Sequence, residues 1–246
     1  MLGALADLAE LTPQDTVVEF GAGLGHFTRL LRETGAKVVA VERDRELAPI
    51  LRAEVEPLGV SVIEADAKTF DLSLIAQGAG GRVVLCGNLP YHLSSPILFH
   101  LLDQRKFLKR AVLLLQKEVA ERVAAPPDTS EYGLLSVLVQ HVADARVGLQ
   151  VPRHFFHPPP DVESAALVLE FLETPRAPVT DELRFRTVVK AGFSQRRKTL
   201  WNAMKSLPGG REAIVATGID RMRRGETLSV EEFASLERAL VQPAPE

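Results

Sequence analysis

Short runs of β-branched and other apolar residues alternate with stretches of helical spacing between Thr16 and Glu170. The strand-like runs are Thr16–Phe20, Lys37–Glu42, Val60–Glu64, Arg82–Cys86, Ala111–Gln116 and Ala165–Phe171. Between these runs, helical spacing is found in stretches such as Leu24–Thr34, Arg45–Val55 and Ser94–Leu102. Such alternation is typical of a mostly parallel sheet that is covered by helices on both faces. The pattern therefore predicts an α/β fold of the Rossmann-like kind.

The pattern changes after Phe171, where residues 174–178 have the composition of a linker. No strand-like run follows, and four short helices are predicted at Asp181–Gly192, Lys198–Ser206, Gly210–Thr217 and Val230–Val241. Ser229 suits the N-cap of the last helix because Glu232 stands three residues later. We therefore predict an α/β domain at residues 1–175 and a small all-helical domain at residues 176–246.

Composition places the chain among globular proteins with a full core, because 46% of its 246 residues are hydrophobic and 25% are charged. The single Cys86 excludes an internal disulfide and a thiolate zinc site, and we expect no metal. No secretory signal and no apolar run of about 18 residues is present, so neither export nor a transmembrane helix is predicted. We expect a cytoplasmic protein without membrane contact.

A glycine-rich turn, Gly21-Ala22-Gly23-Leu24-Gly25, separates the first predicted strand from the first predicted helix. Glycine permits positive φ and close approach of a ligand, and a helix N-terminus offers unpaired N–H groups. The turn therefore predicts a nucleotide-like cofactor, with simple chain reversal as the alternative. His26 stands where the dinucleotide fingerprint requires Gly or Ala, which disfavours a dehydrogenase.

Together with Glu19, this turn forms a Glu-x-Gly-x-Gly-x-Gly pattern that resembles motif I of class I S-adenosylmethionine-dependent methyltransferases. Glu42 ends the next predicted strand, where its carboxylate can accept hydrogen bonds from both ribose hydroxyls. Asp66, followed by Ala67, ends the third strand and can accept a hydrogen bond from the amine of the cofactor's adenine. Ligands bind at the carboxyl ends of parallel strands, so these features jointly predict an S-adenosylmethionine site. A solvated strand-end carboxylate is the alternative for Glu42.

A candidate catalytic motif, Asn88-Leu89-Pro90-Tyr91, follows the fourth predicted strand. The Asn88 amide oxygen and the Pro90 carbonyl are two acceptors for the exocyclic amine of an adenine, and Tyr91 offers a ring face for stacking. Asn88 is also a candidate contact to the cofactor. The motif suits methylation of adenine N6, with an Asx-Pro turn and a core tyrosine as the structural alternative.

Five blocks of sequence carry a resemblance to a known family. They are Asn88–Tyr91, Leu115–Arg122, Tyr132–Val137, Val151–Ser164 and Phe193–Leu200, and they occur in family order. In these blocks the chain resembles the ribosomal RNA adenine N6,N6-dimethyltransferase family of the KsgA type. The resemblance implies a methyltransferase domain with a small helical domain, and S-adenosylmethionine as cofactor. It also implies dimethylation of two adjacent adenines in a hairpin loop near the 3′ end of small-subunit ribosomal RNA.

The resemblance further implies that the chain acts as a monomer on a small-subunit assembly intermediate. Phe156, ahead of His157-Pro158-Pro159-Pro160, becomes the second aromatic wall that sandwiches the flipped adenine against Tyr91. The alternative is that Phe155 and Phe156 are ordinary aromatic residues of the core. The family's N-terminal arm with a Gln-x-Phe-Leu-type signature has no counterpart in the 15 residues ahead of Thr16.

A basic segment stands out in a chain whose net charge is −3. Between residues 184 and 211 there is no Asp or Glu, and the basic residues are Arg184, Arg186, Lys190, Arg196, Arg197, Lys198, Lys205 and Arg211. Phosphates of the RNA backbone are the expected partner, and a solvated helix face is the alternative. The candidate RNA-binding residues are Arg184, Lys190, Arg196, Arg197 and Lys198.

Two other functions remain open at this point. A macrolide-resistance methyltransferase acting on large-subunit RNA shares the Asn-aliphatic-Pro-aromatic motif, but Phe193–Leu200 and Pro158–Pro160 favour the small-subunit enzyme. An assembly or transcription factor that keeps the fold without turnover is the second alternative. Its support is the absence of the N-terminal signature.

Overall fold

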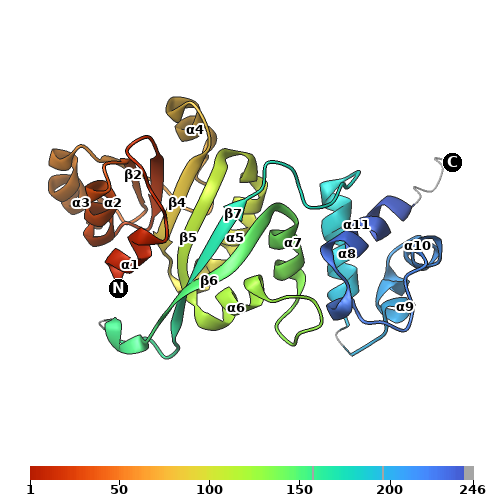
Figure 1. Ribbon diagram of the computed structural model, residues 1–246. Helices are drawn as coiled ribbons and strands as arrows, with labels where there is room; N and C mark the ends of the chain where they lie inside the picture. Colours follow the sequence, from red (N-terminus) through yellow and green to blue (C-terminus); the bar gives the residue numbers. More distant parts are fainter. Residues whose placement is uncertain (157, 196, 241–246) are drawn as a thin grey trace. The chain divides into compact units, whose positions relative to one another are not determined.

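The computed structural model describes residues 1–156, 158–195 and 197–240, which form two compact units (Figure 1). The first unit contains residues 1–121 and 144–173, and the second contains residues 122–143 and the described part of 174–246. The division predicted from the sequence at 175/176 differs from this in two places: the boundary lies two residues earlier, and segment 122–143 groups with the C-terminal helices. In that segment the Tyr132 ring packs edge-on against Phe193, with ring centroids 5.9 Å apart.

The first unit is built on a seven-stranded sheet with strand order β3-β2-β1-β4-β5-β7-β6. Its strands are β1 Thr16–Phe20, β2 Lys37–Glu42, β3 Ser61–Glu64, β4 Val83–Asn88, β5 Leu108–Gln116, β6 Ala143–Val151 and β7 Ser164–Phe171. The ladders from β3 through β2, β1 and β4 to β5 are parallel, whereas β7 pairs antiparallel with β5. This arrangement confirms the predicted α/β class.

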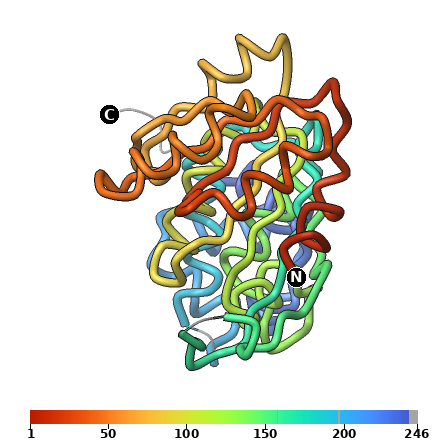
Figure 2. The backbone as a smooth tube through the Cα atoms, turned by 90° about the vertical axis from the view of Figure 1, so that its left-hand side faces the viewer, coloured from red at the N-terminus to blue at the C-terminus, as the bar shows by residue number. Residues whose placement is uncertain are grey.

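Every residue of β1 is buried, because this strand lies inside the sheet with neighbours on both sides. The helices of this region are α1 Leu2–Asp7, α2 His26–Glu33, α3 Leu47–Val55, α4 Ser73–Ala79, α5 Ser94–Asp103 and α6 Lys117–Ala124. Helix α1 packs against α2, and the tube in Figure 2 shows this N-terminal region in red and orange. No helix among the described residues has the length and apolar character needed to cross a membrane.

The second unit is helical. Its helices are α7 Leu134–Val142, α8 Glu182–Phe193, α9 Leu200–Ala203, α10 Gly210–Thr217 and α11 Val230–Ala239. The predicted N-cap of α11 is confirmed, because the Ser229 hydroxyl accepts a hydrogen bond from the Glu232 N–H and the Glu232 carboxylate accepts one from the Ser229 N–H. Stacked rings of Phe193 and Phe233 pack α8 against α11, with centroids 5.6 Å apart.

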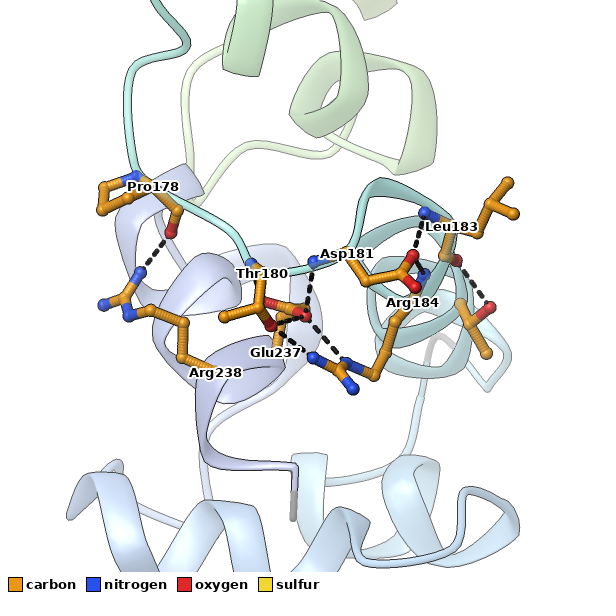
Figure 3. Close-up of polar contacts among 8 residues, drawn as sticks. Pro178, Thr180, Asp181, Leu183, Arg184, Glu237 and Arg238 are labelled. Carbon is orange, nitrogen blue, oxygen red and sulfur yellow. Dashed lines mark hydrogen bonds and ion pairs between the residues drawn. The ribbon is translucent and has the colours of Figure 1, made fainter. Parts of the chain in front are cut away.

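A buried carboxylate ties α11 to the start of α8 (Figure 3). Glu237 is fully buried and accepts hydrogen bonds from the Thr180 N–H at 2.9 Å, the Thr180 hydroxyl at 2.6 Å and the Asp181 N–H at 3.1 Å. Arg184 Nε donates a further hydrogen bond of 2.7 Å. Burial opposes ionisation, but the hydrogen bonds from Thr180 and Arg184 outweigh it and lower the pKa of Glu237.

Candidate active site

The glycine-rich turn after β1 has the backbone conformation that its sequence predicts. Gly21, Gly23 and Gly25 all have positive φ, at 71°, 56° and 82°. At Gly25 an added Cβ would stand 2.8 Å from a methyl carbon of Val55, so α3 also excludes a side chain there. The Gly21 N–H donates to the Val41 carbonyl at 2.9 Å, which places the turn beside the end of β2.

Glu42 holds this turn from the end of β2. One carboxylate oxygen accepts a hydrogen bond from the Gly23 N–H and the other accepts one from the Asp44 N–H, each at 2.8 Å. The residue is only 8% exposed. Each carboxylate oxygen can accept two hydrogen bonds, so Glu42 keeps capacity for hydroxyl groups of a ligand.

Glu19 lies beneath the turn and not in its cavity. The carboxyl is 1% exposed and accepts a hydrogen bond of 2.5 Å from the Thr28 hydroxyl at the start of α2. Burial, opposed by the Thr28 hydrogen bond and assisted by the charge of Glu42, raises the pKa of Glu19 to about 7. Its geometry supports the turn from behind, so the predicted contact of Glu19 with cofactor is at most indirect.

A cavity of about 370 Å³ opens at the carboxyl ends of the strands. Ends of β1, β2 and β4, the segment after β3, and the start of α5 supply its lining, which consists of Gly21, Val41, Glu42, Arg43, Asp44, Ala65, Asp66, Ala67, Leu89, Pro90, Leu93 and Ile97. Four of the predicted cofactor residues are therefore brought together: Gly21, Glu42, Asp66 and Ala67. Gly23, Gly25 and Glu19 shape the turn without lining the cavity.

Asp66 is ionised at the cavity wall. Its Oδ1 accepts a hydrogen bond from the Lys68 N–H at 2.9 Å, and Arg43 and Lys68 form ion pairs with Oδ2 at 3.3 and 3.6 Å. The hydrogen bond from the Lys68 backbone N–H lowers the pKa of Asp66, burial opposes this, and the positive charges of Lys68 and Arg43 lower the pKa further. The wall therefore presents an acceptor that stays charged through neutral pH.

A second cavity of about 270 Å³ is lined by Asn88, Leu89, Pro90, Tyr91, Phe156, Pro158 and Pro160. Leu89 and Pro90 also line the first cavity, so the two cavities adjoin. The predicted aromatic pair, Tyr91 and Phe156, is thus brought to one cavity from distant parts of the chain.

Hydrogen bonds fix the walls of this second cavity. The Tyr91 hydroxyl lies 2.7 Å from the Ser164 hydroxyl at the start of β7, and the Phe156 N–H donates to the Arg153 carbonyl at 3.2 Å. Asn88 is exposed at the end of β4. The Pro90 carbonyl already accepts the Leu93 N–H at 2.9 Å, which leaves one lone pair for a ligand.

The candidate RNA-binding residues lie in the second unit, where the structure separates them into two groups. Lys190, Arg197 and Lys198 are exposed, and Arg196 lies outside the described residues. Arg184 instead donates to Glu237 and Thr180, as Figure 3 shows, so its guanidinium is committed to an internal ion pair. The RNA contact predicted for Arg184 therefore stays a prediction, made for a residue that already serves as the ion-pair partner of the fully buried Glu237.

Sequence reasoning did not select several residues of the first cavity. Arg43 and Asp44 follow Glu42 directly, and their position after a strand end was an available signal. Leu93 and Ile97 carried no such signal, because apolar residues at the start of α5 are equally suited to the core. Within the described part of the chain, no group of His, Cys, Asp or Glu side chains could hold a metal ion.

Residues 2–242 match the family model described as "Ribosomal RNA adenine dimethylase". Among curated relatives, the ribosomal RNA small subunit methyltransferase A of Myxococcus xanthus (strain DK1622) is 51% identical over 245 residues, which are 97% of this chain and 86% of the relative. The protein of the same name from Anaeromyxobacter dehalogenans (strain 2CP-C) is 50% identical and aligns with 98% of this chain and 88% of its own.

Two solved structures share the fold across the whole chain. A dimethyladenosine transferase from Plasmodium falciparum has a TM-score of 0.78 at 24% identity, covering 96% of this chain and 93% of that one. The 23S rRNA methyltransferase ErmE has a TM-score of 0.74 at 23% identity, covering 98% of this chain and 97% of that one. At these identities the likeness shows the architecture alone.

Proposed function

Because this chain belongs to the ribosomal RNA adenine dimethylase family, we propose that it dimethylates N6 of two adjacent adenines in a hairpin loop near the 3′ end of small-subunit ribosomal RNA. The chain is an rRNA adenine dimethyltransferase that uses S-adenosylmethionine, as its sequence predicts. The small-subunit target rests on relatives that carry small-subunit names at 50% identity or more. The single observation that carries the mechanism is the pair of adjoining cavities with Leu89 and Pro90 in both linings.

The first cavity fits the chemistry of S-adenosylmethionine. It offers three carboxylates, from Glu42, Asp44 and Asp66, and apolar walls from Leu93 and Ile97. Glu42 would hold the ribose hydroxyls, and Asp66 and Ala67 would hold the adenine, while the glycines keep the turn open to the ligand. When bound, the cofactor supplies an electrophilic methyl group on a positively charged sulfur. Net negative charge on the wall suits a cationic ligand.

The second cavity would hold the target adenine. Tyr91 and Phe156 stack on the base, and Asn88 and the Pro90 carbonyl accept the two N–H groups of N6. As N6 becomes tetrahedral and positively charged, both acceptors bind its N–H groups more strongly, which stabilises the transition state. In the cavity wall that the structure describes, Tyr91 is the one ionisable group, and its hydroxyl contacts Ser164. The chain's contribution is therefore positioning and electrostatics, and the proton leaves to solvent.

Lys190, Arg197 and Lys198 of the second unit would contact phosphates of the RNA backbone, together with Arg196. Such contacts position the RNA and carry no base information. The base is swung out of its stack into the second cavity, which costs least in an unpaired loop. We propose that the enzyme acts as a monomer on a small-subunit assembly intermediate in the cytoplasm. In this proposal residues 1–175 form the catalytic domain and residues 176–246 form the RNA-binding domain.

Methyl transfer to isolated ribosomal subunits tests the choice of target. Small and large subunits without the relevant methylation are incubated separately with enzyme and methyl-labelled S-adenosylmethionine. Label in the small-subunit RNA alone is the expected result. Label confined to large-subunit RNA would overturn the small-subunit target and favour the function of the 23S rRNA methyltransferase that shares the fold.

A further inference from the structure

An exposed aromatic pair adjoins the cavity proposed for the target adenine. Phe155 and His154 belong to the short 3₁₀ helix Arg153–Phe155, directly ahead of Phe156. Phe155 is 55% exposed, and His154 and Arg153 are exposed as well. The Phe155 N–H donates to the Pro152 carbonyl at 3.1 Å and the Phe156 N–H to the Arg153 carbonyl at 3.2 Å, so the backbone of this segment is held in place.

The two rings lie against each other. Their centroids are 4.6 Å apart and their planes are inclined by 30°. A single exposed apolar side chain needs no explanation. Here, however, a phenyl ring is supported by a second ring on a hydrogen-bonded turn while more than half of its surface stays open to solvent. That arrangement presents a flat apolar surface, which is what a nucleobase stacks on.

The exposed pair His154 and Phe155 lies next to the place where the RNA would enter the second cavity. Phe156 lines the cavity for the target adenine, and the Cα atoms of Phe155 and Phe156 are about 3.8 Å apart, as for any trans peptide. A nucleotide next to the target adenine is joined to it by one phosphodiester, so its base leaves the cavity close to Phe155. Arg153 is exposed, so its guanidinium can reach that phosphodiester.

We propose that Phe155, supported by His154, stacks on the base of a nucleotide that flanks the target adenine, and that Arg153 contacts the phosphate between the two. This proposal rests on the proposed function of the Tyr91 and Phe156 cavity. Stacking on a neighbour offsets the free energy lost when the target adenine is taken out of its own stack. The site favours unpaired RNA, because a base inside a duplex has no free face.

Fluorescence of 2-aminopurine tests this contact directly. Two short single-stranded oligoribonucleotides each contain one adenine, with 2-aminopurine on its 5′ side in one and on its 3′ side in the other. Binding to the wild-type chain should quench one of the two probes by stacking. Phe155→Tyr, which keeps an aromatic ring, should retain the quenching, whereas Phe155→Leu, which keeps apolar bulk without a π face, should lose it.

Steady-state kinetics on under-methylated small subunits supply the second readout. Phe155→Ala and Phe155→Leu should raise KM for the subunit by about five- to a hundredfold, the effect of losing one base–aromatic stack. Leu74→Ala is the matched control, because Leu74 is an exposed apolar residue of α4 with 68% exposure. It should leave KM unchanged.

Equal quenching and equal KM in Phe155→Ala and wild type would overturn the proposal. A separate result would contradict the proposed function of the cavity: methylation at the wild-type rate by the Phe156→Ala and Tyr91→Ala variants. Circular dichroism of each variant excludes misfolding, which is not expected because the Phe155 ring lies outside the core. His154→Ala should weaken quenching less than Phe155→Ala, since His154 acts by positioning the ring.

Discussion

Glu42 accepts a hydrogen bond of 2.8 Å from the backbone N–H of Gly23, so a carboxylate at the end of β2 fixes the turn that follows β1. The other oxygen of Glu42 is bonded to the Asp44 N–H. The residue proposed to hold the cofactor's ribose therefore also sets the shape of the turn beside it. Both roles predict a loss of cofactor affinity on substitution.

Glu42→Ala should weaken S-adenosylmethionine binding by about ten- to a hundredfold, because a charge-assisted hydrogen bond contributes roughly 1.5–3 kcal/mol. Isothermal titration calorimetry measures this directly. Glu64→Ala is a matched control, since Glu64 pairs in register with Glu42 at the end of β3 but is exposed and bonded to Arg45. Wild-type affinity in a folded Glu42→Ala variant would remove Glu42 from the cofactor site.

Asn88→Ala should lower the methylation rate by about a hundredfold or more, as for loss of one preorganised partner of a transition state. Cofactor affinity should change little, because Asn88 lines the second cavity and not the first. Single-turnover kinetics at saturating cofactor separate the two effects. His92→Ala, an exposed neighbour that lines neither cavity, should keep the full rate. Equal losses in rate and cofactor affinity would instead show that Asn88 supports the turn.

The raised pKa of the buried Glu19 carboxyl predicts that the stability of the fold depends on pH. Burial raises its pKa from 4.5 to about 7, so between these values the folded chain holds a proton that the unfolded chain has released. The free energy of unfolding should therefore fall as pH rises from about 4.5 to 7, by at most about 3 kcal/mol from this group. Above pH 7 its contribution is constant.

Urea unfolding of wild type and Glu19→Gln at a series of pH values checks this. The variant carries no ionisable group at this position, so the difference in unfolding free energy between variant and wild type should shift in the variant's favour from pH 5 to pH 7.5. Glu33→Gln, at an exposed position on α2, serves as the control. A difference that stays constant with pH would contradict the raised pKa.

Removing the exposed basic residues should weaken RNA binding through phosphates alone. The variant with Lys190, Arg197 and Lys198 all replaced by Gln should reduce the slope of log K against log salt by up to about 2–3 units. Cofactor affinity should not change. Replacing Arg29, Arg52 and Lys109 by Gln removes the same charge from residues that are ion-paired in the first unit, and should alter the slope less.

The variant Arg184→Gln tests whether Arg184 stabilises the fold, in contrast to the exposed cations that are proposed to bind RNA. Its loss leaves the buried Glu237 with fewer donors, so the melting temperature should fall while the salt slope stays near the wild-type value. Differential scanning calorimetry and a salt titration of RNA binding provide the two readouts. If Arg184→Gln reduced the slope of log K against log salt without lowering the melting temperature, Arg184 would belong to the RNA-binding residues.

Central strands were the most predictable part of the fold. The bounds of β1 and β2 agree with the predicted runs, because parallel strands inside a sheet are buried on both faces and have continuous apolar sequences. Strand β6 was not predicted. It lies at the edge of the sheet, and its sequence contains Asp144, Arg146 and Gly148, so neither an apolar run nor strict alternation marks it.

Site residues with a chemical reason for their place were predictable, whereas those placed by tertiary packing were not. Asn88 and Tyr91 follow a strand end and line the expected cavity. The family resemblance singled out Phe156 and gave no role to Phe155, and the fold places Phe156 in the cavity lining and leaves Phe155 exposed. Arg184 likewise looked like a surface cation, because Glu237 lies far from it in the chain.

Mass spectrometry of ribonuclease fragments of the RNA product tests the central claim most directly. Under-methylated small subunits are incubated with S-adenosylmethionine and either the wild-type chain or Asn88→Ala, and the RNA is digested and examined by mass spectrometry. The account predicts N6,N6-dimethyladenosine at two adjacent adenines near the 3′ end with the wild-type chain, formed about a hundredfold or more slowly by the variant. Methyl groups on another atom or another base, or equal product from both chains, would contradict it.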